Sequence, residues 1–214
     1  MGIQHLGAFG GFQGKAGALV GHRVNGQNVI TGIPYPSTKP PTQLQINARL
    51  RFGLMVDFLR PINSLLRVGF KDVKKEKQSA FNAAFSENYG TISGVAPAYV
   101  ISYDQVIISK GPLAPAYNPE VSTVVGAGIK FDWSALAVLD SGKPTDLVTV
   151  LVYNTVKNMF VGFMGVVPRS ALTYTLDLPA EFAGDQVQCW ISMASADGDL
   201  VSDSVFVGAL TVVA

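Results

Sequence analysis

The chain has 214 residues, of which 48% are hydrophobic and only 14% are charged. This composition excludes an intrinsically disordered protein, which would carry more charge and fewer apolar side chains. The single cysteine, Cys189, excludes an intrachain disulfide and a cysteine-based zinc cluster. So few charges indicate spare apolar surface and favour self-association, although an ordinary β-rich protein with large cores has the same composition.

The net charge of +1 conceals an asymmetry between the two halves of the chain. Residues 1–112 contain 12 Lys and Arg against 5 Asp and Glu, a balance of +7. Residues 113–214 contain 4 against 10, a balance of −6. The asymmetry indicates either an anionic partner for the basic half or a contact between the two halves, within one chain or between copies. No nucleic-acid-binding motif accompanies the basic residues, so nucleic acid is not the expected partner.

The glycine-rich start of the chain predicts a β-hairpin. Asn25-Gly26 is the strongest short hairpin signal, and it separates apolar stretches at residues 18–24 and 27–32. A glycine-rich arm that contains Phe9 and Phe12 precedes the hairpin. We expect this arm to be held by the rest of the chain or by a neighbouring copy, because alone it would be disordered.

A helical segment with short strands follows the hairpin. Four prolines between residues 34 and 41 make the connection extended and stiff. Apolar residues then recur at helical spacing from about residue 43 to residue 60, and Thr42 with Gln45 fits an N-terminal capping box. Pro61 suits the start of a second helix, and a third helix ends near residue 88. Strands are then predicted at residues 99–103 and 105–109.

A proline-rich stretch at residues 111–119 marks the predicted domain boundary, because the charge balance changes sign there. We expect a basic domain at residues 1–112 and an acidic domain at residues 113–214. The acidic domain has short strands between turn signals, predicted at residues 128–133, 147–153, 160–167, 172–178, 187–194 and 205–213. About seven strands in roughly 100 residues are typical of an antiparallel β-sandwich, so the predicted fold class is α+β.

The strand predicted at residues 187–194 has two different faces. Alternation places Trp190 on the face opposite four apolar residues. These residues are Val187, Cys189, Ile191 and Met193. Trp190 therefore needs cover, which we expect from the N-terminal half of the chain or from a neighbouring subunit. A sugar-stacking platform formed by Trp133 and Trp190 is the alternative.

Two resemblances follow from short motifs. Leu176-Asp177-Leu178-Pro179, followed by residues 183–190, resembles the E-to-F corner of an immunoglobulin-like or fibronectin type III domain, where an aromatic residue usually stands at the place of Trp190. Residues 11–17 read Gly-Phe-Gln-Gly-Lys-Ala-Gly, residues 37–42 read Ser-Thr-Lys-Pro-Pro-Thr, and residues 195–198 read Ser-Ala-Asp-Gly. Together with Gln45 and Arg51-Phe52, these motifs resemble those of a bacterial family of unknown function. The resemblances imply an immunoglobulin-like sandwich in the second half and carry no known activity.

The sequence contains no catalytic constellation, so we expect a protein that is not an enzyme. A catalytic triad needs a histidine beside a nucleophile and an acid, but His5 and His22 lie in the glycine-rich region and Cys189 lies in a predicted strand. Gly14-Lys15 lacks the first glycine and the following Ser or Thr of a phosphate-binding loop. We expect no cofactor and no metal.

The sequence also bears on location. Residues 1–12 have neither the basic nor the apolar region of a signal peptide, and no apolar stretch is long enough to span a membrane. We expect synthesis in the cytoplasm; the sequence leaves the final location open, with a surface or a particle as the candidates.

Two hypotheses for function remain. In the preferred one the chain is a structural protein that self-assembles into a filament, ring or shell through its glycine-rich arm and its complementary charged halves. The predicted contact residues are Phe9, Phe12, Lys15, His22 and Trp190. In the alternative the chain is a carbohydrate- or protein-binding module that uses the sandwich loops at residues 165–170 and 196–200.

Overall fold

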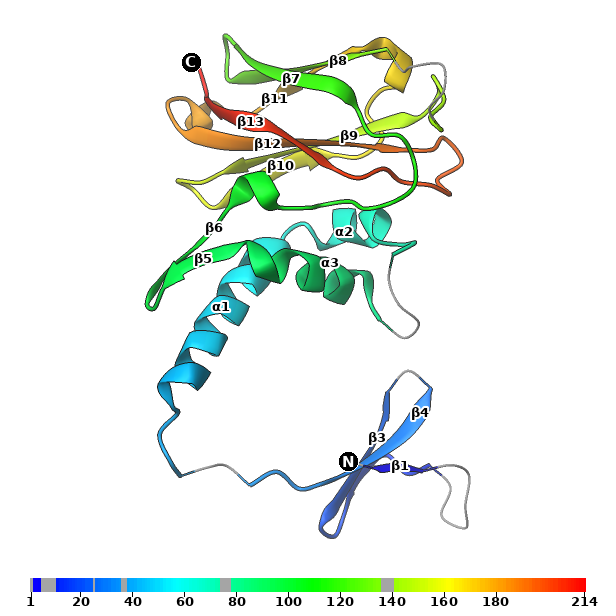
Figure 1. Ribbon diagram of the computed structural model, residues 1–214, viewed down its shortest axis with the longest axis vertical. Coiled ribbons are helices and arrows are strands. Elements are labelled where there is room, and N and C mark those ends of the chain that lie inside the picture. Colours follow the sequence, from blue (N-terminus) through cyan, green and yellow to red (C-terminus); the bar gives the residue numbers. More distant parts are fainter. Residues whose placement is uncertain (1, 5–10, 25, 36–37, 74–77, 136–140) are drawn as a thin grey trace. The chain divides into compact units, whose positions relative to one another are not determined.

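A computed structural model describes residues 2–4, 11–24, 26–35, 38–73, 78–135 and 141–214. The chain divides into two compact units, an N-terminal unit of residues 1–43 and a C-terminal unit of residues 44–214 (Figure 1). The boundary predicted at residues 112 and 113 is therefore wrong as a division between compact units. The reason lies in the packing of the helices on the sandwich, which is described below.

The N-terminal unit is a four-stranded antiparallel sheet with the order β1-β4-β3-β2. Its strands are β1 (Gly2–Gln4), β2 (Gly14–Ala16), β3 (Leu19–Val24) and β4 (Gln27–Gly32). Val24 pairs with Gln27, which confirms the hairpin predicted from the Asn-Gly signal. Gly26 has a φ of 81°, a conformation that glycine adopts without a steric penalty.

The C-terminal unit begins with three helices. They are α1 (Gln43–Leu59), α2 (Asn63–Gly69) and α3 (Ala80–Asn88). Ser79 caps α3, because its side-chain oxygen accepts a hydrogen bond from the backbone N–H of Asn82 at 3.1 Å. The bounds confirm the first and third predicted helices, while the second begins at Asn63, two residues after Pro61. Of the helices in the described part of the chain, none is both long and apolar enough to cross a membrane.

A short hairpin follows the helices and corrects one predicted strand. Strands β5 (Ile92–Val95) and β6 (Ala98–Ile101) form the hairpin, and Tyr103–Gln105 form a 3₁₀ turn, η2. Residues 105–109 do not form the predicted strand. Side chains from distant elements bind their backbone instead: Ile107 N–H donates to Asn88 Oδ1 at 2.8 Å, and Ile108 N–H donates to Ser204 Oγ at 2.9 Å.

The rest of the chain forms a seven-stranded antiparallel sandwich. One sheet has the order β11-β8-β7 and the other the order β10-β9-β12-β13, as in an immunoglobulin-like fold. The strands are β7 (Tyr117–Val124), β8 (Gly128–Ser134), β9 (Leu147–Asn154), β10 (Met159–Phe163), β11 (Thr173–Asp177), β12 (Gln186–Ala194) and β13 (Val205–Thr211). The predicted α+β fold class is confirmed.

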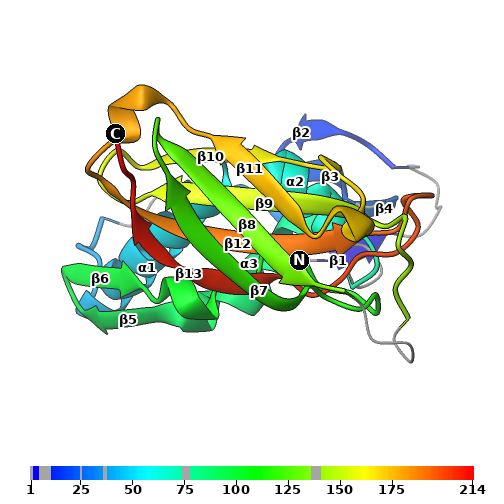
Figure 2. The same cartoon turned by 90° about the horizontal axis from the view of Figure 1, so that it is seen from above.

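The C-terminal unit has three layers, because helices cover the outer face of the four-stranded sheet (Figures 1 and 2). One apolar cluster lies between the two sheets and includes Val150, Val152 and Cys189. A second cluster lies between the sheet and the helices and includes Leu151 and Trp190. Strands β9 and β12 are therefore buried on both faces. Because this second cluster joins helices and sheet into one core, residues 44–112 belong to the same unit as the sandwich.

Candidate functional site

The described side chains of β2, β3 and β4 form almost no core. Of the described residues between 11 and 43, only Gly21 and Val29 are buried. The cross-strand register pairs Lys15 with Val20 and His22 with Val29, so all four side chains lie on one face of the sheet. Lys15 and His22 are both exposed there. The structure therefore brings these two predicted contact residues together on one surface.

Phe12 lies on the opposite face of the same sheet. A side chain at Gly21 would approach the Phe12 ring to 2.8 Å, so the glycine is what allows the half-buried ring to lie against β3. Phe9 lies outside the described residues. The arm thus contributes an apolar group to one face of the sheet, and Lys15 and His22 lie on the other.

Trp190 is fully buried inside the C-terminal unit, so its predicted role in a contact between subunits is wrong. Its ring packs edge-on against Phe206 at 5.6 Å between centroids, within the cluster that the helices cover. The cover that Trp190 needs therefore comes from residues of the predicted basic half of the same chain. Trp133 is only 5% exposed, so a sugar platform of the two tryptophans is also wrong.

The first half of α1 carries apolar side chains that the described part of the C-terminal unit covers only in part, the Phe52 ring lying 5.0 Å from the Phe85 ring between centroids. Met55, Phe58 and Leu59 are buried, but no residue of the helix before Met55 is. Leu44 is 80% exposed and Phe52 is 56% exposed. Leu44, Phe52 and Met55 lie on one stripe at helical spacing, so the face that is buried at one end of α1 is open to solvent at the other. Such a face offers apolar surface for contact with another surface.

A hollow with aromatic walls lies where α1, β6, β9 and β10 meet. It has a volume of about 330 Å³, and its lining includes Phe58, Tyr99, Tyr103, Tyr153 and Phe160. Tyr153 Oη donates a hydrogen bond to Asn158 Oδ1 at 2.8 Å, and burial raises the pKa of Tyr153 to about 12. The phenol is therefore neutral at physiological pH, and the hollow suits an apolar or aromatic group.

A second hollow of about 310 Å³ lies on the other side of Phe160. Its walls come from the connection between α1 and α2, from α2 itself, from β9, and from β10 with the residue after it. They are Pro61, Ile62, Ser64, Leu65, Leu151, Phe160, Gly162, Phe163 and Met164. The sequence alone does not reveal either hollow, because the walls come from segments about 100 residues apart that only the tertiary structure brings together.

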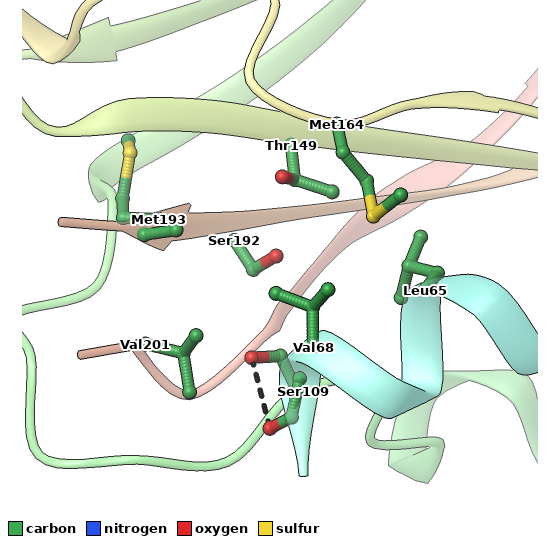
Figure 3. A pocket seen from close by; sticks show the side chains of 10 residues that line it. Leu65, Val68, Ser109, Thr149, Met164, Ser192, Met193 and Val201 are labelled. Atoms are coloured by element: carbon green, nitrogen blue, oxygen red, sulfur yellow. Dashed lines mark hydrogen bonds between the residues drawn. The ribbon is translucent and has the colours of Figure 1, made fainter. Parts of the chain in front are cut away.

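A third cavity, between α2 and strands β9 and β12, is too small for a ligand. Its volume is about 10 Å³, at the lower limit for one water molecule. Figure 3 shows Thr149, Ser192 and Ser109 among its walls. Ser109 Oγ already donates to the carbonyl of Ser202 at 2.7 Å, so the cavity is a packing defect with polar edges.

The sandwich loops proposed for ligand binding are held by internal contacts. In the loop at residues 165–170, Arg169 is 3% exposed and forms an ion pair with Asp146 at 3.3 Å. In the loop at residues 196–200, the Asp197 carboxylate accepts hydrogen bonds from Ser195 Oγ and the backbone of Asp199, which lower its pKa. Within the described ranges, no three His, Cys, Asp or Glu side chains are grouped to hold a metal.

Three solved structures are similar to part of the chain. The fn3 domain of human collagen alpha-1(XX) chain has 14% sequence identity and a TM-score of 0.36, over 47% of this chain and 86% of that one. The fn3 domain of human contactin 1 has 14% identity and a TM-score of 0.34, over 57% of this chain and 93% of that one. The twitchin kinase region of C. elegans has 14% identity and a TM-score of 0.36, over 48% of this chain and 17% of that one.

A search of curated proteins finds no match. A family model, by contrast, covers most of the sequence, from the glycine-rich segment to β13. It matches residues 11–208, which include most of each unit and all the motifs at residues 11–17, 37–42 and 195–198. The chain therefore belongs to a family of unknown function (DUF6266).

Proposed function

We propose that the chain is a non-enzymatic building block that self-assembles, with the N-terminal unit of one copy docking on the next copy. The observation that carries the proposal is the small core of the N-terminal sheet: among the described positions of residues 11–43, only Gly21 and Val29 are buried. A unit of about 40 residues rarely folds stably without disulfides, a metal or association with another surface. A second copy of the chain can provide such a surface, because it is present wherever the protein itself is present.

The charges of the chain support a head-to-tail contact. Residues 1–43 contain Lys15, Arg23 and Lys39 and no acidic residue, a balance of +3. The sandwich that begins after residue 112 has a balance of −6. Complementary fields of this kind steer association and fix the orientation of the partners. The docking of one copy's basic unit on another copy's acidic sandwich would therefore depend on salt.

A head-to-tail contact also determines the kind of assembly. The two surfaces in a head-to-tail contact are different, and each copy carries both of them. Every bound copy therefore leaves one surface free to bind the next copy, and the assembly can continue to grow. Growth produces a filament if the rotation between copies does not close, and a ring or shell if it does. The three-residue edge strands β1 and β2 of the N-terminal sheet add backbone groups that can extend another sheet.

The test reverses charge in the N-terminal unit. K15E/R23E changes the balance of residues 1–43 from +3 to −1 and leaves the two cores of the C-terminal unit unchanged. We expect light scattering at low salt to show large particles for the unaltered chain and small ones for K15E/R23E. At 1 M salt, where the Debye length is about 3 Å, the large particles should disperse.

The matched control is R60E/R67E, which makes the same change in net charge at two exposed positions outside the acidic sandwich. It should assemble like the unaltered chain. A monomer at low salt, or equal loss of assembly in both double variants, would contradict the proposed docking and favour the binding module instead.

A further inference from the structure

Strand β10 leaves an unpaired edge on the four-stranded sheet. Its five residues pair with β9 without any irregularity, from Met159 opposite Asn154 to Phe163 opposite Val150. On its other side no strand pairs with it in the described part of the chain. Such an edge presents a row of backbone donors and acceptors that can pair with another strand.

The other three edge strands of the sandwich carry features that discourage such pairing. β7 contains Pro119 and an irregular register between Tyr117 and Glu120. β11 ends in the charged residue Asp177. β13 has a register shift opposite Cys189 and Trp190 and lies beside β7. β10 reads Met-Phe-Val-Gly-Phe, with no charge, no proline and no bulge, so it is the unprotected edge.

Apolar side chains and hollows flank this edge. Met159, Phe163 and Met164 are 44%, 53% and 49% exposed. On the side that faces the helices, the two hollows of about 330 and 310 Å³ lie on either side of Phe160. Strand addition typically combines backbone hydrogen bonds with pockets for alternate side chains, and β10 offers both.

We propose that β10 pairs antiparallel with β10 of a second copy, about a two-fold axis at Val161. This axis places Met159 opposite Phe163 of the second copy and Phe160 opposite Gly162 of the second copy. It joins two four-stranded sheets into one continuous sheet of eight strands. An axis at any other residue of β10 pairs fewer than all five positions.

The side chains in this register complement one another. Phe160 faces a glycine, so its ring keeps its contacts with Tyr153 and Phe58 of its own copy and meets no large side chain across the pair. Met164 of the second copy lies opposite Asn158, at the rim of the aromatic hollow, and methionine adapts to such irregular spaces. No like charges meet, because β10 has no ionisable residue and the nearby Lys157 is paired with Asp185.

The occupant is a second copy because the edge complements itself. The contact is two-fold symmetric, so it is separate from the head-to-tail docking proposed above and does not rest on it. Two five-residue strands form a short interface, at the weak end of specific contacts, so the pairing should depend on concentration. Together the two contacts would cross-link head-to-tail chains of copies into a wider assembly.

Disulfide trapping tests the register. V161C places a thiol on the axis, opposite the same thiol of the second copy. In M159C/F163C, each cysteine lies opposite a cysteine of the second copy, which gives two pairs of thiols. The single variants M159C and F163C place no thiol opposite another. With diamide as the oxidant, both V161C and M159C/F163C should yield covalent dimers on a non-reducing gel. The native Cys189 should not compete, because it is buried and burial raises its pKa to about 12.

The control for trapping is V125C, a thiol at an 82% exposed position away from β10. Covalent dimer from M159C/F163C no more abundant than from V125C would overturn the proposal. The same cross-links should form in the K15E/R23E background. Light scattering thus reports on the head-to-tail contact, and disulfide trapping reports on the β10 contact independently of it.

Charge pairs give a second, non-covalent test. M159K/F163K places lysine opposite lysine at two symmetric positions, whereas M159K/F163E places lysine opposite glutamate. By sedimentation at low salt in the K15E/R23E background, the lysine pair should weaken dimerisation about tenfold relative to the mixed pair. Equal association of the two double variants would show that this register is not the one used.

Discussion

Tyr153 links the sandwich to the helical layer, and its phenol makes the fold sensitive to alkaline pH. Burial and the neighbouring Tyr103 raise its pKa from 10.0 to about 12. The unfolded chain releases this proton near pH 10, so the contribution of the group to stability is complete below pH 10 and is lost as the pH rises towards 12. We predict that the free energy of unfolding, measured by urea unfolding, decreases less between pH 10 and pH 12 in Y153F than in the unaltered chain.

The control for this prediction is Y35F, which changes a tyrosine that is 88% exposed. Its alkaline profile should equal that of the unaltered chain. A profile for Y153F that is as steep as that of the unaltered chain would mean that another group is responsible for the alkaline loss.

Helix α1 is one element in two environments. Its C-terminal half is anchored by Met55, Phe58 and Leu59, whereas residues 47–52 have no buried side chain. An isolated helical end of this length is marginal in water, so its stability depends on the cover it receives. We predict that amides of residues 47–52 exchange with deuterium faster than those of residues 55–59 in dispersed protein at high salt, and slow down in the assembly at low salt.

Strand β12 provides the reference for that measurement, since it is buried on both faces and should be protected equally in both states. Equal protection of residues 47–52 in the dispersed and assembled protein would show that assembly leaves this surface uncovered.

At the scale of the whole molecule, both apolar cores lie in the C-terminal unit. Every buried residue of the two apolar clusters lies at Met55 or beyond, within the C-terminal unit. We predict that a chain of residues 44–214 unfolds at the same temperature as the dispersed full chain, followed by circular dichroism, but does not form large particles in light scattering. A clearly lower unfolding temperature would show that residues 1–43 contribute to the stability of this unit.

Local patterns predicted several of the elements correctly. Asn-Gly predicted the first hairpin, helical spacing predicted α1, and alternation in β12 correctly separated Cys189 from Trp190. The strand predicted at residues 105–109 was wrong, because its backbone is bound by Asn88 and Ser204, which lie far from it in the sequence. Hydrogen bonds between distant residues leave no periodic signal.

The sequence by itself determined the class of fold, the charge asymmetry and the family, since these depend on short motifs and composition. Only the tertiary structure decided which elements bury which side chains. It placed Trp190 under the helices, joined residues 44–112 to the sandwich, and formed hollows on both sides of Phe160. Lys15 and His22 share a face because of strand register, and β10 lies at an edge because of strand order. Burial and edge position depend on contacts between elements that are distant in the sequence. A local pattern predicts only which side chains lie on each face of one element.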